Sequence, residues 1–440
     1  MMQKKKLFFL IVLLVVTSGL LAIDNAHFYK SANLHKKSTV GWFDELEKYD
    51  TLDWFTKIDF NYLYGDSGSC WDKNGHSAPL LNSTGNYDML YLMENVPVKP
   101  DFQHYATFLA NAQIYHERTN STFGQLKFDG KFELNEVNID LRQNLVSGFF
   151  LEGHLPVRDV SLKNISYNDM SPETGIYNKN MAQWRQFKNQ LDVILQNYGL
   201  NSATKKYSQT GLGDLSILVG WQGIKENKED DTTRFLGLTL KGGILFPTGN
   251  KDKTDYVFSL PTGYNGHWGI PLAVEGEIGF LGWLTLSAHA SAVFFFDDDN
   301  KTRRMKTFTK QQGYIKLLDG QAEEEKGTLW HIGADIKFDH LAKGLSFLVG
   351  YSYNRQEEDE LDPKDTTHFI KSVVNSDPLL EAWYMHVLHF MLDYDFSVHM
   401  QDSKWAPRIN VFYNYPFDGK RAFKTDTIGG GLGVDVRWKL

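Results

Sequence analysis

The chain has 440 residues, a formal net charge of −8 and a mean hydropathy of −0.38. This balance excludes a strongly basic nucleic-acid surface, and we expect no nucleic-acid partner. Glycine (37 residues) and aromatic residues (14%) are abundant and proline (12 residues) is scarce, which favours twisted antiparallel β structure. The single cysteine, Cys70, cannot form an internal disulfide, so the fold depends on other interactions.

The first 22 residues have the pattern of a secretory signal peptide. Lys4, Lys5 and Lys6 precede an apolar run over 7–16, and the small residue Ala22 closes the segment. An uncleaved anchor is the alternative, but the run is short beside the roughly 20 residues of a spanning helix. We predict a signal peptide at 1–22, an N-terminal periplasmic segment at 23–56 and one domain at 57–440.

Alternating polarity predicts β-strands through most of the chain. In the stretch 210–223, Leu215, Ile217, Val219 and Trp221 are separated mostly by small or polar residues. A half-buried strand of a soluble sandwich has this pattern, and so does a strand with lipid on one side and water on the other. The segments that share it are 57–65, 124–134, 137–145, 148–158, 213–223, 234–246, 270–281, 283–296, 329–339, 344–354, 385–398, 407–416 and 427–440.

So many alternating segments favour a closed barrel over a soluble β protein, and several reach the roughly 10 residues that a tilted strand needs to cross a bilayer. We predict an all-β fold: a transmembrane antiparallel up-and-down β-barrel. The connections alternate between short ones (about 282, 340–343, 399–406) and longer ones (247–269, 297–328, 355–384, 417–427), as outer-membrane barrels do.

This alternation places the C-terminus on the periplasmic side. With both ends on that side the strand number is even, so a further strand is expected in the gap 66–123. The segment 104–118 is a weak candidate, since it could equally be a short helix. We therefore predict about 14 strands, within a range of 12–16.

One segment departs from the two-residue period. In 177–200, apolar residues such as Trp184, Phe187, Leu191 and Ile194 recur at steps of three and four, which predicts an amphipathic helix ended by Gly199. This helical insertion could cover the barrel rim, enter the lumen or lie on the membrane surface. We favour the rim.

The inner face of the barrel gives the candidate pore lining. Ionisable residues occupy the second, polar face of the predicted strands, and their mixed signs lean slightly acidic. The candidates are Lys241, Glu275, Glu277, His289, Asp335, Lys337, Asp393, Asp395, Arg408, Asp435 and Arg437.

The C-terminal strand has a pattern of its own. Leu432, Val434, Val436, Trp438 and Leu440 alternate as in the terminal strand that the barrel-assembly machinery reads, although Leu440 replaces the usual aromatic residue.

No sequence signal supports catalysis or a cofactor. Ser287, His289 and Ser291 share one face of a strand, but a pleat alone produces this spacing. Hydrolase, zinc-protease and phosphate-loop motifs do not occur, and the histidines are scattered. We expect no enzyme activity, no metal and no cofactor.

Two stretches carry a family resemblance. "GLGDLSILVGWQ" at 211–222 and "LKGGILFPTGN" at 240–250 resemble the G-x-G-D-L strand and the P-T-G strand end of a bacterial porin-like family named for the meta-cleavage pathway of phenol degradation. The similarity covers roughly 40 residues. It implies an outer-membrane channel or transporter, with a link to aromatic substrates that comes from the family name alone.

Together these patterns predict a bacterial outer-membrane channel for passive passage of small molecules, with hydrophobic or aromatic ones among the candidate solutes. Its expected partners are outer-membrane lipid and lipopolysaccharide, the barrel-assembly machinery and the solute. The alternative is a structural or adhesive barrel with a closed lumen that displays long surface loops.

Overall fold

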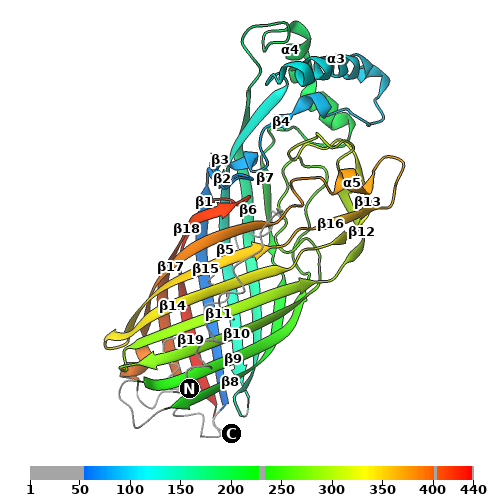
Figure 1. The fold of residues 1–440 in the computed structure, drawn as a ribbon. Coiled ribbons are helices and arrows are strands. Elements are labelled where there is room, and N and C mark those ends of the chain that lie inside the picture. The colour runs from blue at the N-terminus through cyan, green and yellow to red at the C-terminus, as the bar shows by residue number, and fades with distance from the viewer. Residues whose placement is uncertain (1–53, 146, 227–232, 401–403, 439–440) are drawn as a thin grey trace, which may run out of the picture.

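The computed structural model describes residues 54–145, 147–226, 233–400 and 404–438. Its main feature is a closed ring of twelve antiparallel strands (Figure 1). Each strand pairs with its neighbours in the chain, and the first pairs with the last. The strands are β1 (Trp54–Ser67), β5 (Gln125–Asn144), β6 (Phe149–Asp169), β8 (Leu215–Glu226), β9 (Thr233–Phe246), β10 (Gly269–Phe280), β11 (Leu284–Phe295), β14 (Leu329–Ala342), β15 (Leu345–Gln356), β17 (Trp383–Asp395), β18 (Trp405–Lys420) and β19 (Asp426–Trp438).

This ring confirms the prediction of an all-β, antiparallel up-and-down barrel, within the predicted range of strand numbers. The central figure of 14 was too high for two reasons. The segments 124–134 and 137–145 form one strand, the 20-residue β5. The weak strand candidate 104–118 lies in a helix, α3 (Gln103–Thr119), whose buried Tyr105, Phe108, Leu109 and Ala112 recur at helical spacing.

The connections at the end of the ring where Trp54 pairs with Trp438 include two tight turns. Leu281 and Gly282, two of the three residues that join β10 to β11, both have positive φ (52° and 71°). Two successive residues of this kind suit a tight turn between twisted antiparallel strands. The expected short turns at about 282 and 340–343 are therefore present. The connection expected at 417–427 is shorter than predicted, because β18 continues to Lys420 and β19 begins at Asp426.

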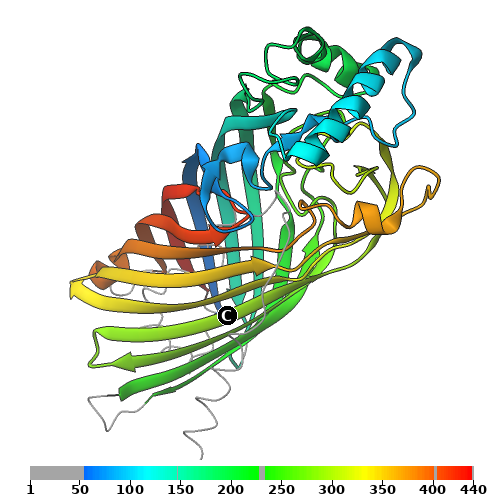
Figure 2. The same cartoon turned by 45° about the horizontal axis from the view of Figure 1, so that its top comes forward.

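The opposite end of the ring bears a folded cap (Figures 1 and 2). Most of the buried apolar core lies here, between the outer parts of β5 and β6 and the segments around them. The cap elements are β2 (Ser69–Trp71), β3 (Ser77–Pro79), η3 (Leu80–Asn82), β4 (Tyr87–Asp88), η4 (Met89–Tyr91), η5 (Pro100–Phe102), α3, α4 (Ala182–Asn197), β7 (Tyr207–Leu212), β12 (Asp298–Arg304), β13 (Asp319–Glu325), β16 (Glu360–Pro363) and α5 (Lys371–Val374). A further short helix, η6 (Phe396–His399), lies between β17 and β18.

The predicted helix within 177–200 is α4, and it lies in the cap rather than inside the ring (Figure 1). Its buried Trp184 and Phe187 stack on each other, with ring centroids 5.4 Å apart, and Trp184 also contacts Phe123. The indole Nε1 of Trp184 donates a hydrogen bond to Asp169 at the end of β6. The apolar stripe of α4 therefore packs on the cap core, as the favoured rim position requires.

The two long predicted loops 297–328 and 355–384 fold together. Acidic residues of both loops, such as Asp298 and Glu360, lie in strands, because β12 and β16 both pair with β13 in a three-stranded sheet. Met305, Ala322, Leu361 and Phe369 form a small apolar cluster in this part of the cap. These loops are therefore packed structure rather than free chain.

The two stretches that carry the family resemblance meet at the rim of the ring. Asp214 of the first accepts hydrogen bonds from the backbone N–H groups of Gly249 and Tyr264, and Thr248 of the second donates its hydroxyl to the Gly213 carbonyl. A Cβ on Gly263 would collide with the Asp214 carboxylate, so this approach requires glycine. The motifs thus anchor the 247–268 loop to the start of β8.

Within the described residues, no helix is long and apolar enough to cross a membrane. The predicted signal peptide and nearly all of the 23–56 segment lie outside the described residues, as does Leu440.

Replacing Asp214 with alanine tests this anchor. The change leaves two backbone N–H groups at a buried site without their acceptor, at a cost of roughly 1–3 kcal/mol each. We expect a clear loss of stability of the refolded barrel in detergent, measured by urea unfolding. Asp72→Ala is the matched control, because Asp72 also accepts two backbone N–H groups (Asn74 and His76) but in an exposed turn that water can solvate. Equal losses for the two variants would contradict this account.

Candidate functional site: the barrel interior

The ring separates apolar and polar side chains by face. On β10, Leu272, Val274 and Ile278 point outwards and are exposed, whereas Glu275 and Glu277 occupy the opposite face. The register continues this division across strands, since Glu275 lies opposite His289 of β11 and Thr239 of β9. The alternation that predicted the strands therefore separates the outside of the ring from its interior.

The interior wall is polar and densely packed. Its buried polar residues include Lys57, Glu136, Asn138, Arg142, Glu152, Thr239, Thr285, His331, Asp335, Lys337, Ser346, Ser352, Asn354, His389, Asp393, Asp395, Arg408, Asn414, Thr427 and Asp435. Buried groups of this kind are stable only when they are hydrogen-bonded or ion-paired.

Histidines connect much of this wall. The hydroxyl of Ser287 donates to Asp335, and His289 also contacts Asp335, with Nδ1 3.6 Å from Oδ2. The Nε2 atoms of His289 and His331 are 2.9 Å apart, and Nδ1 of His331 lies 2.6 Å from Oδ1 of Asn354. One of the two histidines must therefore donate a proton to the other, which fixes their relative tautomers.

The same network continues around the ring. Asn354 donates to Ser352, whose hydroxyl lies 2.7 Å from Nε2 of His389. The other nitrogen of His389 lies 2.7 Å from Oδ1 of Asn414, and Asn414 donates to Thr427. The contacts span six consecutive strands of the ring, from β11 to β19.

Arg408 is the centre of a second set of contacts. Its Nη2 lies 3.0 Å from Asp59 of β1 and 2.9 Å from Asp435 of β19, and its side chain is 2% exposed. One guanidinium thus joins three adjacent strands at the place where the ring closes. Further interior pairs are Lys241 with Glu152, Lys337 with Asp339, and Arg158 with Glu136.

The predicted pore-lining residues divide into two groups. Lys241, Glu275, Glu277, His289, Asp335, Lys337, Asp393, Asp395, Arg408 and Asp435 all lie on the interior face of barrel strands. Arg437 lies in β19, opposite Phe55 of β1 in the register. The structure brings His289 to Asp335 and Arg408 to Asp435, while their role as pore lining stays a prediction. The sequence analysis did not include His331 and Asn414 among the candidates. Both could have been found, because they occupy the positions of β14 and β18 that alternate with the apolar outer residues and so face the interior.

The predicted assembly signal lies on the last strand. Leu432 is 65% exposed and lies on the outer face of β19, whereas Asp435 lies on the interior face of the same strand. Trp438 is the last residue of β19 and pairs with Trp54. The recognition of this strand by an assembly machinery stays a prediction.

The serine and histidine contacts can be compared with a hydrolase site. Ser287, which shares a strand face with His289, donates its hydroxyl to Asp335 rather than to His289. Ser352, His389 and Asn414 are connected in the order of a Ser–His–Asn triad, but Ser352 is 0% exposed and also accepts a hydrogen bond from Asn354. A nucleophile must reach its substrate, so the burial of Ser352 favours a structural role.

The closed ring, its apolar outer face and its polar interior define a transmembrane-type β-barrel. No protein-family model and no curated protein matches the sequence.

Similar solved structures include three bacterial chains, each 10% identical in sequence. They are an outer membrane channel from Pseudomonas putida F1 (88% of this chain and 96% of that chain covered, TM-score 0.46), the translocator domain of the autotransporter NalP from Neisseria meningitidis (93% and 100%, 0.35) and the toluene transporter TodX of Pseudomonas putida (94% and 96%, 0.32). The fold assignment depends on the strand pairing of this chain alone.

Replacing Arg408 with methionine tests the ring-closing contact. The change leaves Asp59 and Asp435 without their shared cation, and breaking a buried pair in this way costs about 3–5 kcal/mol. We expect a lower urea midpoint for the refolded barrel, partly restored by adding Asp59→Asn and Asp435→Asn. The control Lys131→Gln removes an exposed pair with Asp66 and should lower the midpoint much less. An unchanged midpoint for Arg408→Met would contradict the assignment.

Proposed function

We propose that this chain is a bacterial outer-membrane channel through which small molecules pass passively. The observation that carries the proposal is the division of faces in a closed ring: apolar side chains cover the outside, and charged and polar side chains cover the interior. Lipid outside and water inside would stabilise this division. The proposed role is transport rather than enzymatic catalysis.

The proposed location is the outer membrane, reached through the predicted signal peptide at 1–22. Membrane lipid and lipopolysaccharide would surround the apolar outer face, and the assembly machinery would recognise the last strand. The resemblance of 211–222 and 240–250 to the porin-like family of the phenol meta-pathway supports small hydrophobic or aromatic solutes. The contact between these two motifs at the rim gives a physical reason for their occurrence together.

A second candidate function has an observation of its own. The interior charges are buried and paired, as at Arg408 and Lys241, and the outer loops form a packed cap. These features favour a barrel with a closed lumen that displays surface structure. Twelve strands also enclose less space than the 14 expected from the sequence, which brings opposite walls closer together.

Single-channel recording separates these two functions. The full mature chain is refolded, inserted into a planar lipid bilayer and measured under a salt gradient. We expect discrete conductance steps and a reversal potential that indicates weak cation preference, because acidic residues slightly outnumber basic ones among the proposed pore-lining residues. Folded protein that gives no steps would contradict the channel and favour the closed barrel.

The double variant Asp393→Asn with Asp395→Asn tests the source of the selectivity. Both carboxylates lie on the interior of β17 and are nearly fully buried. Removing two interior negative charges should shift the reversal potential towards anions, whereas Asp297→Asn with Asp299→Asn removes two exposed charges beyond the end of β11 and should leave it nearly unchanged. Equal shifts of the reversal potential in the two double variants would contradict the placement of Asp393 and Asp395 in the proposed pore.

A further inference from the structure

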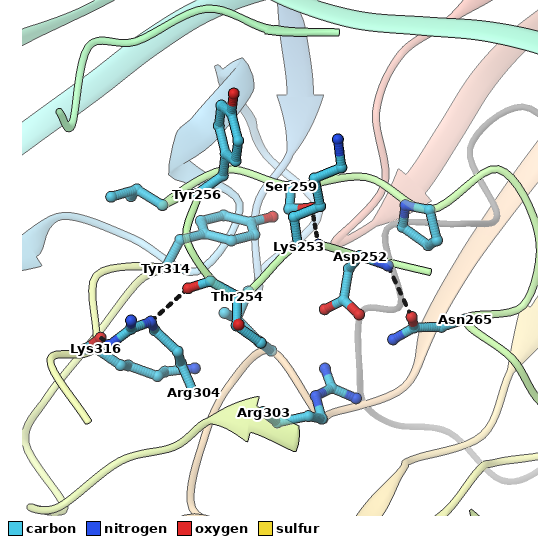
Figure 3. A pocket seen from close by; sticks show the side chains of 13 residues that line it. Asp252, Lys253, Thr254, Tyr256, Ser259, Asn265, Arg303, Arg304, Tyr314 and Lys316 are labelled. Atoms are coloured by element: carbon cyan, nitrogen blue, oxygen red, sulfur yellow. Dashed lines mark hydrogen bonds between the residues drawn. The ribbon is translucent and has the colours of Figure 1, made fainter. Parts of the chain in front are cut away.

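The cap contains a polar cavity of about 90 Å³, between the 247–268 loop and the end of β12 with the segment that leads to β13 (Figure 3). A single water needs roughly 10–15 Å³ of such space, so the cavity can hold a ligand of several heavy atoms. Its walls include the charged Asp252, Lys253, Arg303, Arg304 and Lys316, the rings of Tyr256 and Tyr314, and the apolar Leu379. This site lies outside the ring of strands and takes no part in the interior network.

The loop wall of the cavity is held in place by hydrogen bonds. The backbone N–H of Asp252 donates to Asn265, and that of Lys253 donates to the hydroxyl of Ser259. On the opposite wall, Nε of Arg304 donates to the Thr254 carbonyl, so the two walls are tied together (Figure 3). The cavity is therefore formed before a ligand arrives, which lowers the entropy cost of binding.

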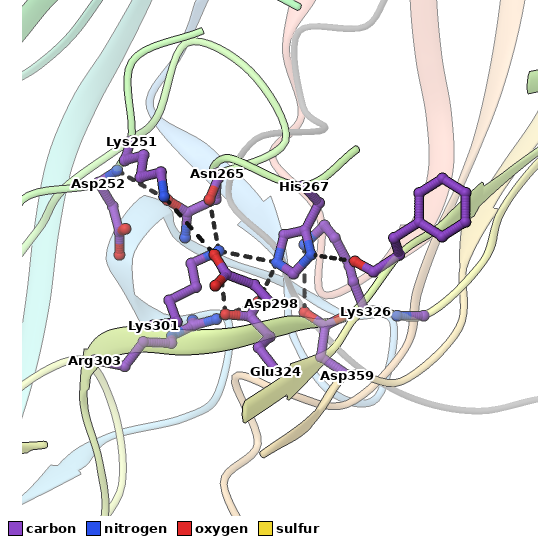
Figure 4. Close-up of polar contacts among 12 residues, drawn as sticks. Lys251, Asp252, Asn265, His267, Asp298, Lys301, Arg303, Glu324, Lys326 and Asp359 are labelled. Carbon is purple, nitrogen blue, oxygen red and sulfur yellow. Dashed lines mark hydrogen bonds and ion pairs between the residues drawn. The ribbon is translucent and has the colours of Figure 1, made fainter. Parts of the chain in front are cut away.

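The cationic side of the cavity is Arg303. Its Nη1 lies 2.7 Å from Glu324, a fully buried carboxylate that also contacts Lys301 and His267 (Figure 4). Burial lowers the pKa of Arg303, but the carboxylates of Glu324 and Asp252 outweigh burial and raise it overall. Glu324 orients the guanidinium through a single nitrogen, and the other donors of Arg303 make no hydrogen bond to a described residue.

The anionic side of the cavity is Asp252. Its backbone is fixed, but its carboxylate accepts no hydrogen bond from any residue that the structure describes. The carboxylate points into the same space as Arg303 (Figure 3), yet the two groups are too far apart for a direct ion pair. Among the other cations of the lining, Arg304 donates to backbone carbonyls and Lys316 pairs with Asp377, while Lys253 lies on the loop wall. The cavity thus presents one carboxylate, Asp252, and the Arg303 guanidinium on different walls, each with unused hydrogen-bonding capacity.

We propose that this cavity binds a small zwitterion, in which an ammonium group contacts Asp252 and a carboxylate contacts Arg303. Charge-assisted hydrogen bonds are roughly twice as strong as neutral ones. A ligand with an ammonium group near Asp252 and a carboxylate near Arg303 therefore forms a strong hydrogen bond with each wall. An α-amino acid has this arrangement within a few bonds. Its side chain would lie towards Tyr256, Tyr314 and Leu379.

Ligands with other charges make fewer favourable contacts with the walls of the cavity. A simple anion would contact Arg303 but would meet the Asp252 carboxylate, and a simple cation would meet Arg303. A neutral sugar would form hydrogen bonds to both walls without the charge assistance. These differences in affinity make the proposal measurable, and they do not depend on whether the barrel conducts.

The test is isothermal titration of the full mature chain in detergent with alanine, acetate, ethylammonium and glucose. We expect saturable alanine binding and at least tenfold weaker binding of the other three. Asp252→Asn should weaken alanine binding at least tenfold and reduce the difference in affinity between alanine and acetate. Asp299→Asn is the matched control, since it makes the same change at an exposed residue of β12, and it should leave alanine binding unchanged.

Several results would overturn the proposal. Folded wild-type protein that binds no alanine would exclude the site, and acetate or glucose binding as tightly as alanine would indicate an anion or sugar site instead. Unchanged alanine affinity in Asp252→Asn would place any binding elsewhere. Arg303→Gln provides a second variant. It should weaken the binding of both alanine and acetate, and it should leave the affinity for ethylammonium unchanged or higher.

Discussion

Closure of the hydrogen-bonded ring is the constraint on which the rest of the structure depends. In lipid no water replaces a lost backbone partner, so each barrel strand needs a neighbour on both sides. The β1–β19 ladder meets this need at the last position, with pairs from Trp54 opposite Trp438 to Asp66 opposite Asp426. Once the ring is closed, the pleat assigns every second side chain to the interior. The Arg408 contacts then add side-chain pairing to the same closing seam.

The long strands β5 and β6 show how one pleat serves two environments. On β5, the inner face carries Phe128, Phe132 and Leu134 in the cap, but Glu136, Asn138 and Arg142 within the barrel. The outer face changes in the opposite sense, since Val137 and Leu141 are exposed at barrel depth. The apolar phase therefore inverts near residue 135 although the strand continues. A sequence pattern reads this inversion as the end of one strand and the start of another, which is why 124–134 and 137–145 were predicted separately.

The strands, and the face on which each of their residues lies, could be predicted from the alternation of polar and apolar residues. The contacts between strands could not. Glu275, Asp335 and Asp393 reach the interior because polar residues alternate with apolar ones on their own strands. The contact between His289 and His331 depends on the register of β11 against β14, where His331 lies opposite Ser291. No local pattern specifies that register. At 104–118 the local pattern left a strand and a short helix open, and the need for an even strand number favoured the strand, whereas the structure forms helix α3 there.

The composition of β5 and β6 also bears on why the barrel interior is polar. These two strands can support an apolar inner face, because in the cap that face packs into the main core. The polar interior of the ring is therefore no consequence of strand geometry, since the same pair of strands changes to charged residues on entering the barrel. Replacing buried ion pairs with apolar residues is often neutral or stabilising, so stability alone does not account for Glu136, Arg158 and Arg408. All three are nearly fully buried and ion-paired, and each pair joins neighbouring strands, so we infer that these contacts fix a strand register that an apolar interior would leave unspecified.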